Sequence, residues 1–124
     1  MTKILILVVE DDVEMLDLLK LELSRQGHDV LTATGGVKAL ATAESEQPDL
    51  ILLDVMLPDI DGYHVARQLS ERMGNNCPKI LIMSSRDTKR EKGIALMSGA
   101  TSIIQKPFHI DELQLIIAET LRKN

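Results

Sequence analysis

The sequence predicts an α/β fold of the doubly wound type, in which one parallel sheet is covered by helices on both faces. Short apolar runs alternate with segments of helical periodicity five times along the 124 residues. The central runs are continuously apolar, as strands covered on both faces are. Because crossovers between parallel strands are right-handed, this alternation leaves few other architectures. A chain of this length fits one domain, expected to span residues 1–124.

Five segments are expected to form the strands of the sheet. Residues 4–9 read ILILVV, a continuous apolar run rich in β-branched side chains. Residues 50–53 and 80–83 are similar runs, and each suits a strand buried on both faces. Weaker strands are expected at residues 29–33 and 101–105.

Apolar residues at helical spacing separate these strands and are expected to face the core. The predicted core stripes are Met15, Leu19 and Leu23; Val37, Leu40 and Ala41; Val65 and Leu69; Ile94 and Met97; and Leu113, Ile117 and Leu121. Gly27, Gly74 and Gly99 follow the first, third and fourth stripes, where a left-handed cap favours glycine.

Composition and charge argue against several classes of function. The net charge is −5 and the basic residues are dispersed, so direct binding of nucleic acid is not expected. Cys77 is the only cysteine, which rules out an intrachain disulfide and fits a reducing, cytoplasmic location. No segment approaches membrane-spanning length, so no membrane association is expected either.

Polar residues collect where the predicted strands end. The carboxyl ends of parallel strands share one edge of the sheet, which is where open α/β sheets bind ligands. Four strands deliver polar groups to this edge, and in chain order these are Glu10, Asp11 and Asp12; Asp54; Ser84 and Ser85; and Lys106.

Asp54 ends a buried-type run in the stretch DLILLDVMLPDIDG, where an ionised carboxylate loses hydration. A turn-opening aspartate before Pro58 is the alternative interpretation.

Converging carboxylates repel one another, and a divalent cation relieves that repulsion. A set of oxygen ligands favours Mg²⁺, with Mn²⁺ as a substitute. With the Ser84 hydroxyl and the Lys106 ammonium nearby, the site suits phosphoryl transfer to a carboxylate.

Four motifs, VVEDD, PDLILLDVMLPDIDG, MSS and QKPF, resemble in order and spacing the receiver domain of two-component response regulators. The resemblance covers essentially the whole chain and implies a flavodoxin-like (βα)5 fold with strand order 2-1-3-4-5. It implies that Asp54 accepts a phosphoryl group from a histidine kinase or a histidine phosphotransfer domain, with Mg²⁺. The chain would be a signalling switch and not an enzyme, catalysing only its own phosphorylation and dephosphorylation.

The resemblance also implies a metal ligand set. Asp11 corresponds to the direct carboxylate ligand, and Glu10 to the acid that acts through water. Asp54 is the phosphoacceptor and a further ligand, and the backbone carbonyl of Met56 is the third ligand from the protein. Asp12 is expected to cap the following helix instead of binding the metal.

Two further residues acquire roles in the same way. Ser84 corresponds to the switch hydroxyl, with Ser85 as the alternative one step along the chain. Lys106 corresponds to the lysine that pairs with the phosphate, and the resemblance implies a cis bond between Lys106 and Pro107.

The sequence departs from the family pattern on the expected switch face, made by the fourth helix, the fifth strand and the fifth helix. Ile103 stands where many receivers have a rotating Tyr or Phe, so either an aliphatic side chain or the fourth helix must report the switch. Receivers that dimerise usually carry a set of charged residues across the fifth strand and the fifth helix. Two of those positions are Ser102 and Ile116 here, so we expect a monomer or a weak phosphorylation-dependent dimer. Leu115, Ile103 and Ile116 are expected to form a modest patch for a downstream partner or output domain.

Two smaller expectations concern the surface. His28, His64 and His109 are expected to face solvent and to bind no metal. Leu16 and Leu21 lie off the stripe of the first helix, the helix on which the resemblance places the docking kinase, and are expected to offer a second surface.

Other classes of function fit the sequence less well. An aspartate-nucleophile phosphatase has a general acid two residues after the nucleophile, where this chain has Met56. A pseudo-receiver that only scaffolds typically lacks the acid pair, the phosphoacceptor or the lysine, and all of these are present. A flavin-binding module needs a glycine-rich phosphate loop and stacking aromatics, which the sequence lacks.

Overall fold

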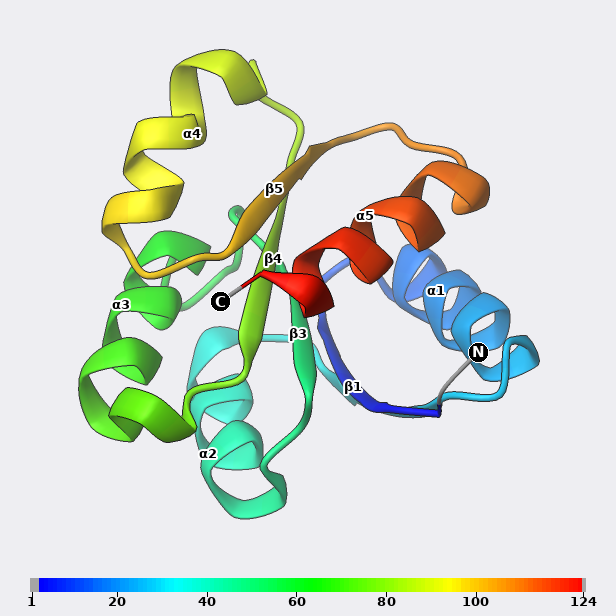
Figure 1. Ribbon diagram of the computed structural model, residues 1–124, viewed down its shortest axis with the longest axis horizontal. Coiled ribbons are helices and arrows are strands. Elements are labelled where there is room, and N and C mark those ends of the chain that lie inside the picture. The colour runs from blue at the N-terminus through cyan, green and yellow to red at the C-terminus, as the bar shows by residue number, and fades with distance from the viewer. Residues whose placement is uncertain (1–2, 124) are drawn as a thin grey trace.

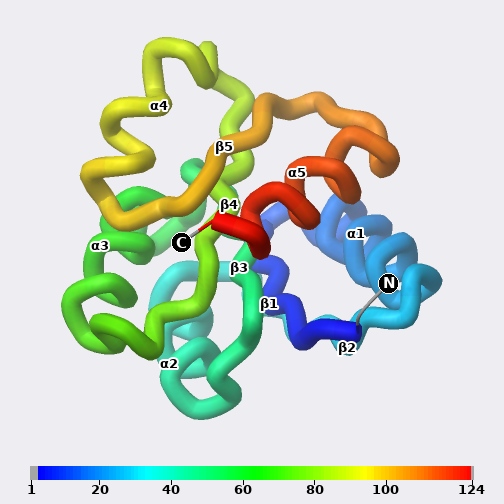
Figure 2. Tube along the Cα trace, viewed as in Figure 1, coloured from blue at the N-terminus to red at the C-terminus, as the bar shows by residue number. Residues whose placement is uncertain are grey.

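The structure, a computed structural model, describes residues 3–123 and contains a five-stranded parallel sheet. The strand order is β2-β1-β3-β4-β5, which confirms the prediction (Figures 1 and 2). The strands are β1 (Leu5–Val9), β2 (Asp29–Ala33), β3 (Leu50–Asp54), β4 (Lys79–Ser84) and β5 (Ser102–Gln105).

Helices follow each strand and cover both faces of the sheet. They are α1 (Val13–Arg25), α2 (Gly36–Glu46), α3 (Gly62–Met73), α4 (Thr88–Met97) and α5 (Ile110–Arg122), with a short 3-10 turn, η1 (Gly74–Asn76), after α3. The helices α1 and α5 lie on one side of the sheet, and α2, α3 and α4 lie on the other (Figures 1 and 2). No helix among residues 3–123 is long and apolar enough to cross a membrane.

The core forms two layers because successive side chains of a strand point to opposite faces. On β1, Leu7 and Val9 pack in the layer under α2 and α3, whereas Ile6 and Val8 pack in the layer under α1 and α5. All the residues of β3 are buried, which explains its continuous apolar sequence. The sheet therefore holds β1 and β3 at the centre of the molecule.

The predicted core stripes are wrong in part for α2 and α4. Val37 and Ala41 are exposed on α2, and the small residues Ala39 and Ala43 face the sheet instead. Leu40 is buried between these two alanines, as predicted.

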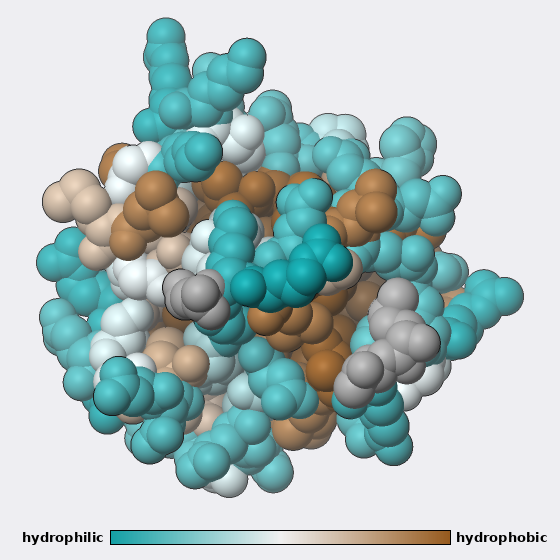
Figure 3. Space-filling model, in the orientation of Figure 1, coloured by the Kyte–Doolittle hydropathy of each residue, from teal (hydrophilic) through white to brown (hydrophobic). Residues whose placement is uncertain are grey.

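The error is larger on α4. Ile94 and Met97 are 52% and 80% exposed, and Ala95 packs on the sheet together with the carboxylate-bearing Glu91. Figure 3 shows apolar side chains reaching the surface around this helix, between polar groups. The helix α4 is thus attached to the fold by few apolar contacts.

Two surface predictions also need correction. His28 is only 6% exposed, because it lies in the turn before β2 and its Nδ1 accepts a hydrogen bond from the Ile4 amide at 3.3 Å. Leu16 is buried in the layer between α1 and the sheet, whereas Leu21 is exposed as predicted. His64 and His109 are exposed, as expected.

Helix boundaries follow the predicted signals. The glycines Gly27, Gly74 and Gly99 all have positive φ, at 93°, 54° and 96°. The Gly99 site is also crowded, since a Cβ there would lie 1.9 Å from the Ser70 Oγ. Asp12 caps α1 as predicted and accepts the amides of Glu14 and Met15.

Candidate functional site

The residues predicted to form the site meet at the carboxyl edge of the sheet. Asp54 ends β3 and Ser84 ends β4, whereas Glu10 and Lys106 directly follow β1 and β5. The strands are in register, with Asp54 opposite Met83 on β4, so their last residues reach the same edge. Glu10, Asp54 and Ser84 are buried there, at 1%, 5% and 1% exposure.

The backbone around Asp54 is tightly folded. The β ladder continues one residue further, where the Val55 amide donates to the Met83 carbonyl at 3.1 Å. The chain then returns at Gly62, where a Cβ would lie 2.3 Å from the Asp54 carbonyl oxygen. Only glycine permits this approach, so the start of α3 fixes the end of β3.

Three carboxylates form a cluster at this edge. One oxygen from each of Glu10, Asp11 and Asp54 lies within 4.8 Å of the other two. Asp11 is exposed, whereas the other two are buried, so the cluster opens to solvent on one side. An all-oxygen set with few carboxylates and room for water has the donor chemistry that fits Mg²⁺.

Lys106 supplies the positive charge of the site. Its Nζ lies 3.3 Å from Asp54 Oδ2 and donates a hydrogen bond to Glu10 Oε1. Burial, followed by the contact with Asp54, raises the pKa of Glu10. Burial alone would lower the pKa of Lys106, but the two carboxylates outweigh it and raise the pKa. Lys106 is thus charged at neutral pH and compensates part of the carboxylate charge.

Both candidate serines lie at this edge of the sheet. Ser84 is buried at the end of β4, and its Oγ accepts a hydrogen bond from the Arg86 amide at 3.1 Å. Ser85 is exposed and lines a hollow there together with Glu10 and Lys106. Ser84 is thus the more firmly held of the two. The Lys106-Pro107 bond is cis, as predicted.

Met56 lies beside Asp54, whereas Ile103 lies apart from the acidic cluster. Met56 is in the loop after β3, its amide lies 3.4 Å from Asp54 Oδ1, and its side chain is exposed. Ile103 is half-buried on β5 and packs against the core layer of α2 and α3. It is the one predicted site residue on the face between α4 and α5, away from the acidic cluster.

Sequence reasoning missed a polar network that links the site to α4. The Tyr63 hydroxyl donates to Glu91 Oε1 at 2.7 Å, and Glu91 is only 9% exposed. Arg86 Nη1 lies 3.5 Å from Glu91 Oε2, and Arg86 Nη2 lies 3.2 Å from the Met56 sulfur. Burial and the Glu91 carboxylate raise the pKa of Tyr63. The sequence offered one signal for this network, because Tyr63 is the only tyrosine in a chain with few aromatic residues.

The chain is thus an α/β domain with a five-stranded parallel sheet, and it carries acids, a hydroxyl and a lysine at the carboxyl edge of that sheet. The family model of the response regulator receiver domain matches residues 6–118, so the chain belongs to that family. Receiver domains of this kind are signalling proteins that interact with histidine kinases and output domains.

Curated relatives support the family assignment. The chain is 41% identical over 119 residues to the alkaline phosphatase synthesis transcriptional regulatory protein PhoP of Bacillus subtilis, covering 96% of this chain and 49% of that one. It is 40% identical over 118 residues to the response regulator MprA of Mycobacterium tuberculosis, covering 95% and 50%. The chain thus spans about half the length of these relatives.

Solved structures show the same fold. The BeF3-activated receiver domain of RstA from Klebsiella pneumoniae has a TM-score of 0.86 at 31% identity, covering 96% of this chain and 99% of that one. A putative response regulator from Chloroflexus aurantiacus has a TM-score of 0.89 at 28% identity, covering 98% and 100%.

Proposed function

We propose that residues 1–124 act as a single receiver domain in which Asp54 is phosphorylated by a histidine kinase or a histidine phosphotransfer domain. The observation that carries this proposal is the convergence of Glu10, Asp11 and Lys106 on a buried Asp54. Asp11, Asp54 and the Met56 carbonyl would hold Mg²⁺, or Mn²⁺ in its place, with Glu10 acting through water. The bound ion would neutralise charge on the transferred phosphoryl group.

The reaction uses the side chains of the chain in defined ways. An Asp54 carboxylate oxygen attacks phosphorus, an O–P bond forms, and the P–N bond of the donor phosphohistidine breaks with the electron pair leaving on the histidine nitrogen. Lys106 pairs with a phosphoryl oxygen, and Ser84 donates a hydrogen bond to another. Attack by water on the acyl phosphate later releases inorganic phosphate and resets Asp54. The chain thus catalyses only its own modification and its reversal.

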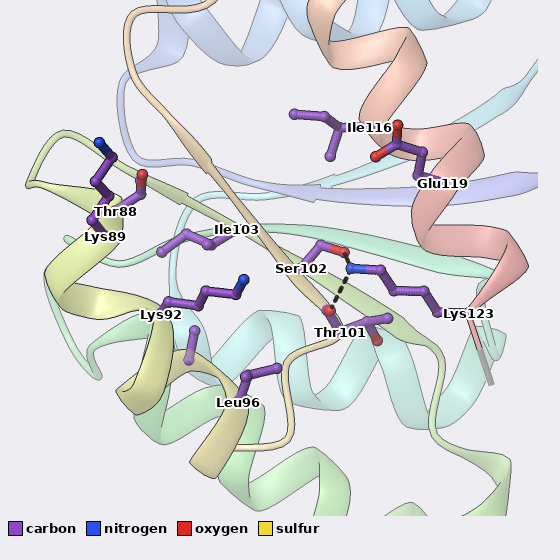
Figure 4. Close-up of a pocket in the computed structure, with 11 residues that line it drawn as sticks. Thr88, Lys89, Lys92, Leu96, Thr101, Ser102, Ile103, Ile116, Glu119 and Lys123 are labelled. Carbon is purple, nitrogen blue, oxygen red and sulfur yellow. Dashed lines mark hydrogen bonds between the residues drawn. The ribbon is translucent and has the colours of Figure 1, made fainter.

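Phosphorylation would be read out on the face made by α4, β5 and α5. The phosphorylated Asp54 carries a total charge of about −1.5 to −2 in place of the −1 of the carboxylate, and its new acceptor oxygens draw Ser84 inward. A hollow of about 310 Å³ lies on this face, with Ile103, Ile116 and Leu96 among its lining residues (Figure 4). Lys123 borders it and donates to Ser102 Oγ at 2.9 Å. The movement of Ile103 or of α4 would reshape this hollow.

The same proposal covers the partners. A downstream protein or an output domain would bind this face, and Leu115 is exposed beside it for such a contact. We propose a monomer or a weak phosphorylation-dependent dimer, because Ser102 and Ile116 interrupt the charged set. We propose no direct contact with nucleic acid or membrane. A cytoplasmic location agrees with Cys77, a free thiol.

The test is the intact mass of the protein after incubation with acetyl phosphate and Mg²⁺. One phosphoryl adduct is expected in the wild type, and none in Asp54→Asn or with EDTA. Mn²⁺ is expected to restore the adduct after EDTA treatment. An adduct that persists in Asp54→Asn would contradict the assignment of the phosphoacceptor, and one that forms without metal would contradict the metal site.

A further inference from the structure

The loop between β3 and α3, residues 55–61, is fastened to the N-terminus of α2 by Asp59. Asp59 Oδ1 accepts the Gly36 amide at 2.8 Å, and Oδ2 accepts the Val37 amide at 3.0 Å. The same Oδ1 accepts the Ile60 amide at 2.9 Å. A single carboxylate therefore joins two segments that are more than twenty residues apart in the chain.

The start of α2 is shaped to receive this carboxylate. Its N-cap is Gly35, which makes no side-chain cap of its own, so Asp59 takes the place of the missing cap. A Cβ on Gly35 would lie 3.1 Å from both Asp59 oxygens. Hydrogen bonds from Val37 and Gly36 lower the pKa of Asp59 to about 2, so the carboxylate is ionised at neutral pH.

The loop that Asp59 fastens also carries Met56. The loop is closed at its base, where the Gly62 and Leu57 amides both donate to the Val55 carbonyl, at 2.8 and 3.2 Å. Asp59 ties the far end of the loop to α2 by hydrogen bonds, and Ile60 packs beside it, since a Cβ on Gly36 would lie 3.1 Å from the Ile60 Cβ. Met56 thus lies on a loop that is held at both ends.

We propose that Asp59 is a positioning residue for the metal site. It holds loop 55–61 so that the Met56 carbonyl is presented beside Asp11 and Asp54, without touching the metal itself. This inference rests on the proposed function, because it assumes that the cluster binds Mg²⁺. Groups that orient metal ligands without contacting the metal typically change affinity by about 10- to 100-fold when removed.

The experiment measures the dissociation constants of Mg²⁺ and Mn²⁺ by titration calorimetry, and the stability by urea unfolding. Asp59→Ala is expected to raise the dissociation constants of both ions roughly tenfold. Asp59→Asn keeps one acceptor oxygen, so its affinity is expected to lie between those of the wild type and Asp59→Ala.

A second variant separates positioning from helix stability. In Asp59→Ala with Gly35→Ser, the serine can cap α2 from its own N-cap position, where the backbone is extended and the carboxylate no longer crowds it. This double variant is expected to regain stability while its affinity for Mg²⁺ stays weak.

The outcomes are distinguishable. Unchanged metal affinity in Asp59→Ala would overturn the inference and leave the proposed function intact. If the affinity for Mg²⁺ returns together with stability in the double variant, Asp59 acts only as a helix cap. That result would also overturn the inference. A wild type that binds neither ion would overturn the proposed metal site and this inference together.

Discussion

β3 and α4 both border the candidate site, and they differ in how they are held. The strand β3 is buried along its whole length and pairs with a strand on each side. Ala95 is the one apolar residue that α4 buries, while Ile94, Leu96 and Met97 are more than half exposed. Asp54, the proposed phosphoacceptor, thus lies on the more firmly held of the two elements.

The attachment of α4 is largely polar. Glu91 points toward the interior and accepts the Tyr63 hydroxyl, and Arg86 approaches it from the loop after β4. Elements with few buried apolar contacts open at lower free energy than the core of a domain. The molecule thus combines a firmly packed centre, which carries the acidic cluster, with a helix that is held mainly by polar contacts.

The largest difference between β3 and α4 is expected in the free energy of unfolding that is lost when one side chain of each is truncated. Leu52→Ala on β3 is expected to lower the free energy of unfolding by about 2–5 kcal/mol, because Leu52 is fully buried. Ile94→Ala on α4 is expected to cost less than about 1 kcal/mol, because Ile94 is 52% exposed. Urea unfolding followed by circular dichroism measures both, since the chain has no Trp. Equal losses would contradict the comparison.

The next effect concerns charge at the centre. Lys106→Met leaves Glu10 and Asp54 without their ammonium partner and is expected to cost up to about 3 kcal/mol at neutral pH, since Lys106 is partly exposed. Loss of the ammonium raises the pKa of Glu10 further above its unfolded value, so stability is retained at low pH and lost as pH rises. Urea unfolding from pH 4 to 8 should show a deficit that grows with pH. A constant deficit would contradict the electrostatic cause.

A smaller effect tests the attachment of α4. Tyr63→Phe removes the hydroxyl that Glu91 accepts and is expected to cost about 1–2 kcal/mol. Amide hydrogen exchange should accelerate in α4 and stay unchanged in β1. Ser45→Ala, which removes an exposed hydroxyl bond in α2, is the matched control and should change neither. Unchanged exchange in α4 would show that Tyr63 does not hold it.

The smallest effect concerns His28, far from both regions. Burial lowers the pKa of His28. A group whose pKa is lowered by folding contributes stability above its unfolded pKa, about 6.5, and that stability is lost as pH falls through the folded value. His28→Asn keeps an acceptor and cannot titrate in this range, so it should lose less stability than the wild type between pH 7 and 5. Equal losses of stability in the wild type and in His28→Asn would show that His28 does not cause this pH dependence.

The fold was predictable because strands buried on both faces leave a local signal. The predicted strand at residues 4–9 differs by one residue from β1, and that at 80–83 lacks one residue at each end of β4. The positions of Asp54, Ser84 and Lys106 follow from the same signal, because the carboxyl ends of parallel strands meet at one edge.

The packing of α4 was not predictable from periodicity. Ile94 and Met97 have helical spacing, but the space beside the sheet is filled by Ala95 and Glu91. The choice depends on Tyr63 and Arg86, which come from other segments. The role of Asp59 was missed for the same reason, since Asp59 lies in a loop and its partners Gly36 and Val37 lie at the start of α2, in another part of the chain.

The most direct test of the central claim is hydrogen exchange measured by mass spectrometry with and without Mg²⁺ and beryllofluoride, which accompanies the activated state of the RstA receiver. A site at the centre that controls a loosely held edge predicts changed protection in α4 and β5, unchanged protection in β1 and β3, and no response in Asp54→Asn. No change in α4 and β5, or the same change in Asp54→Asn, would contradict it.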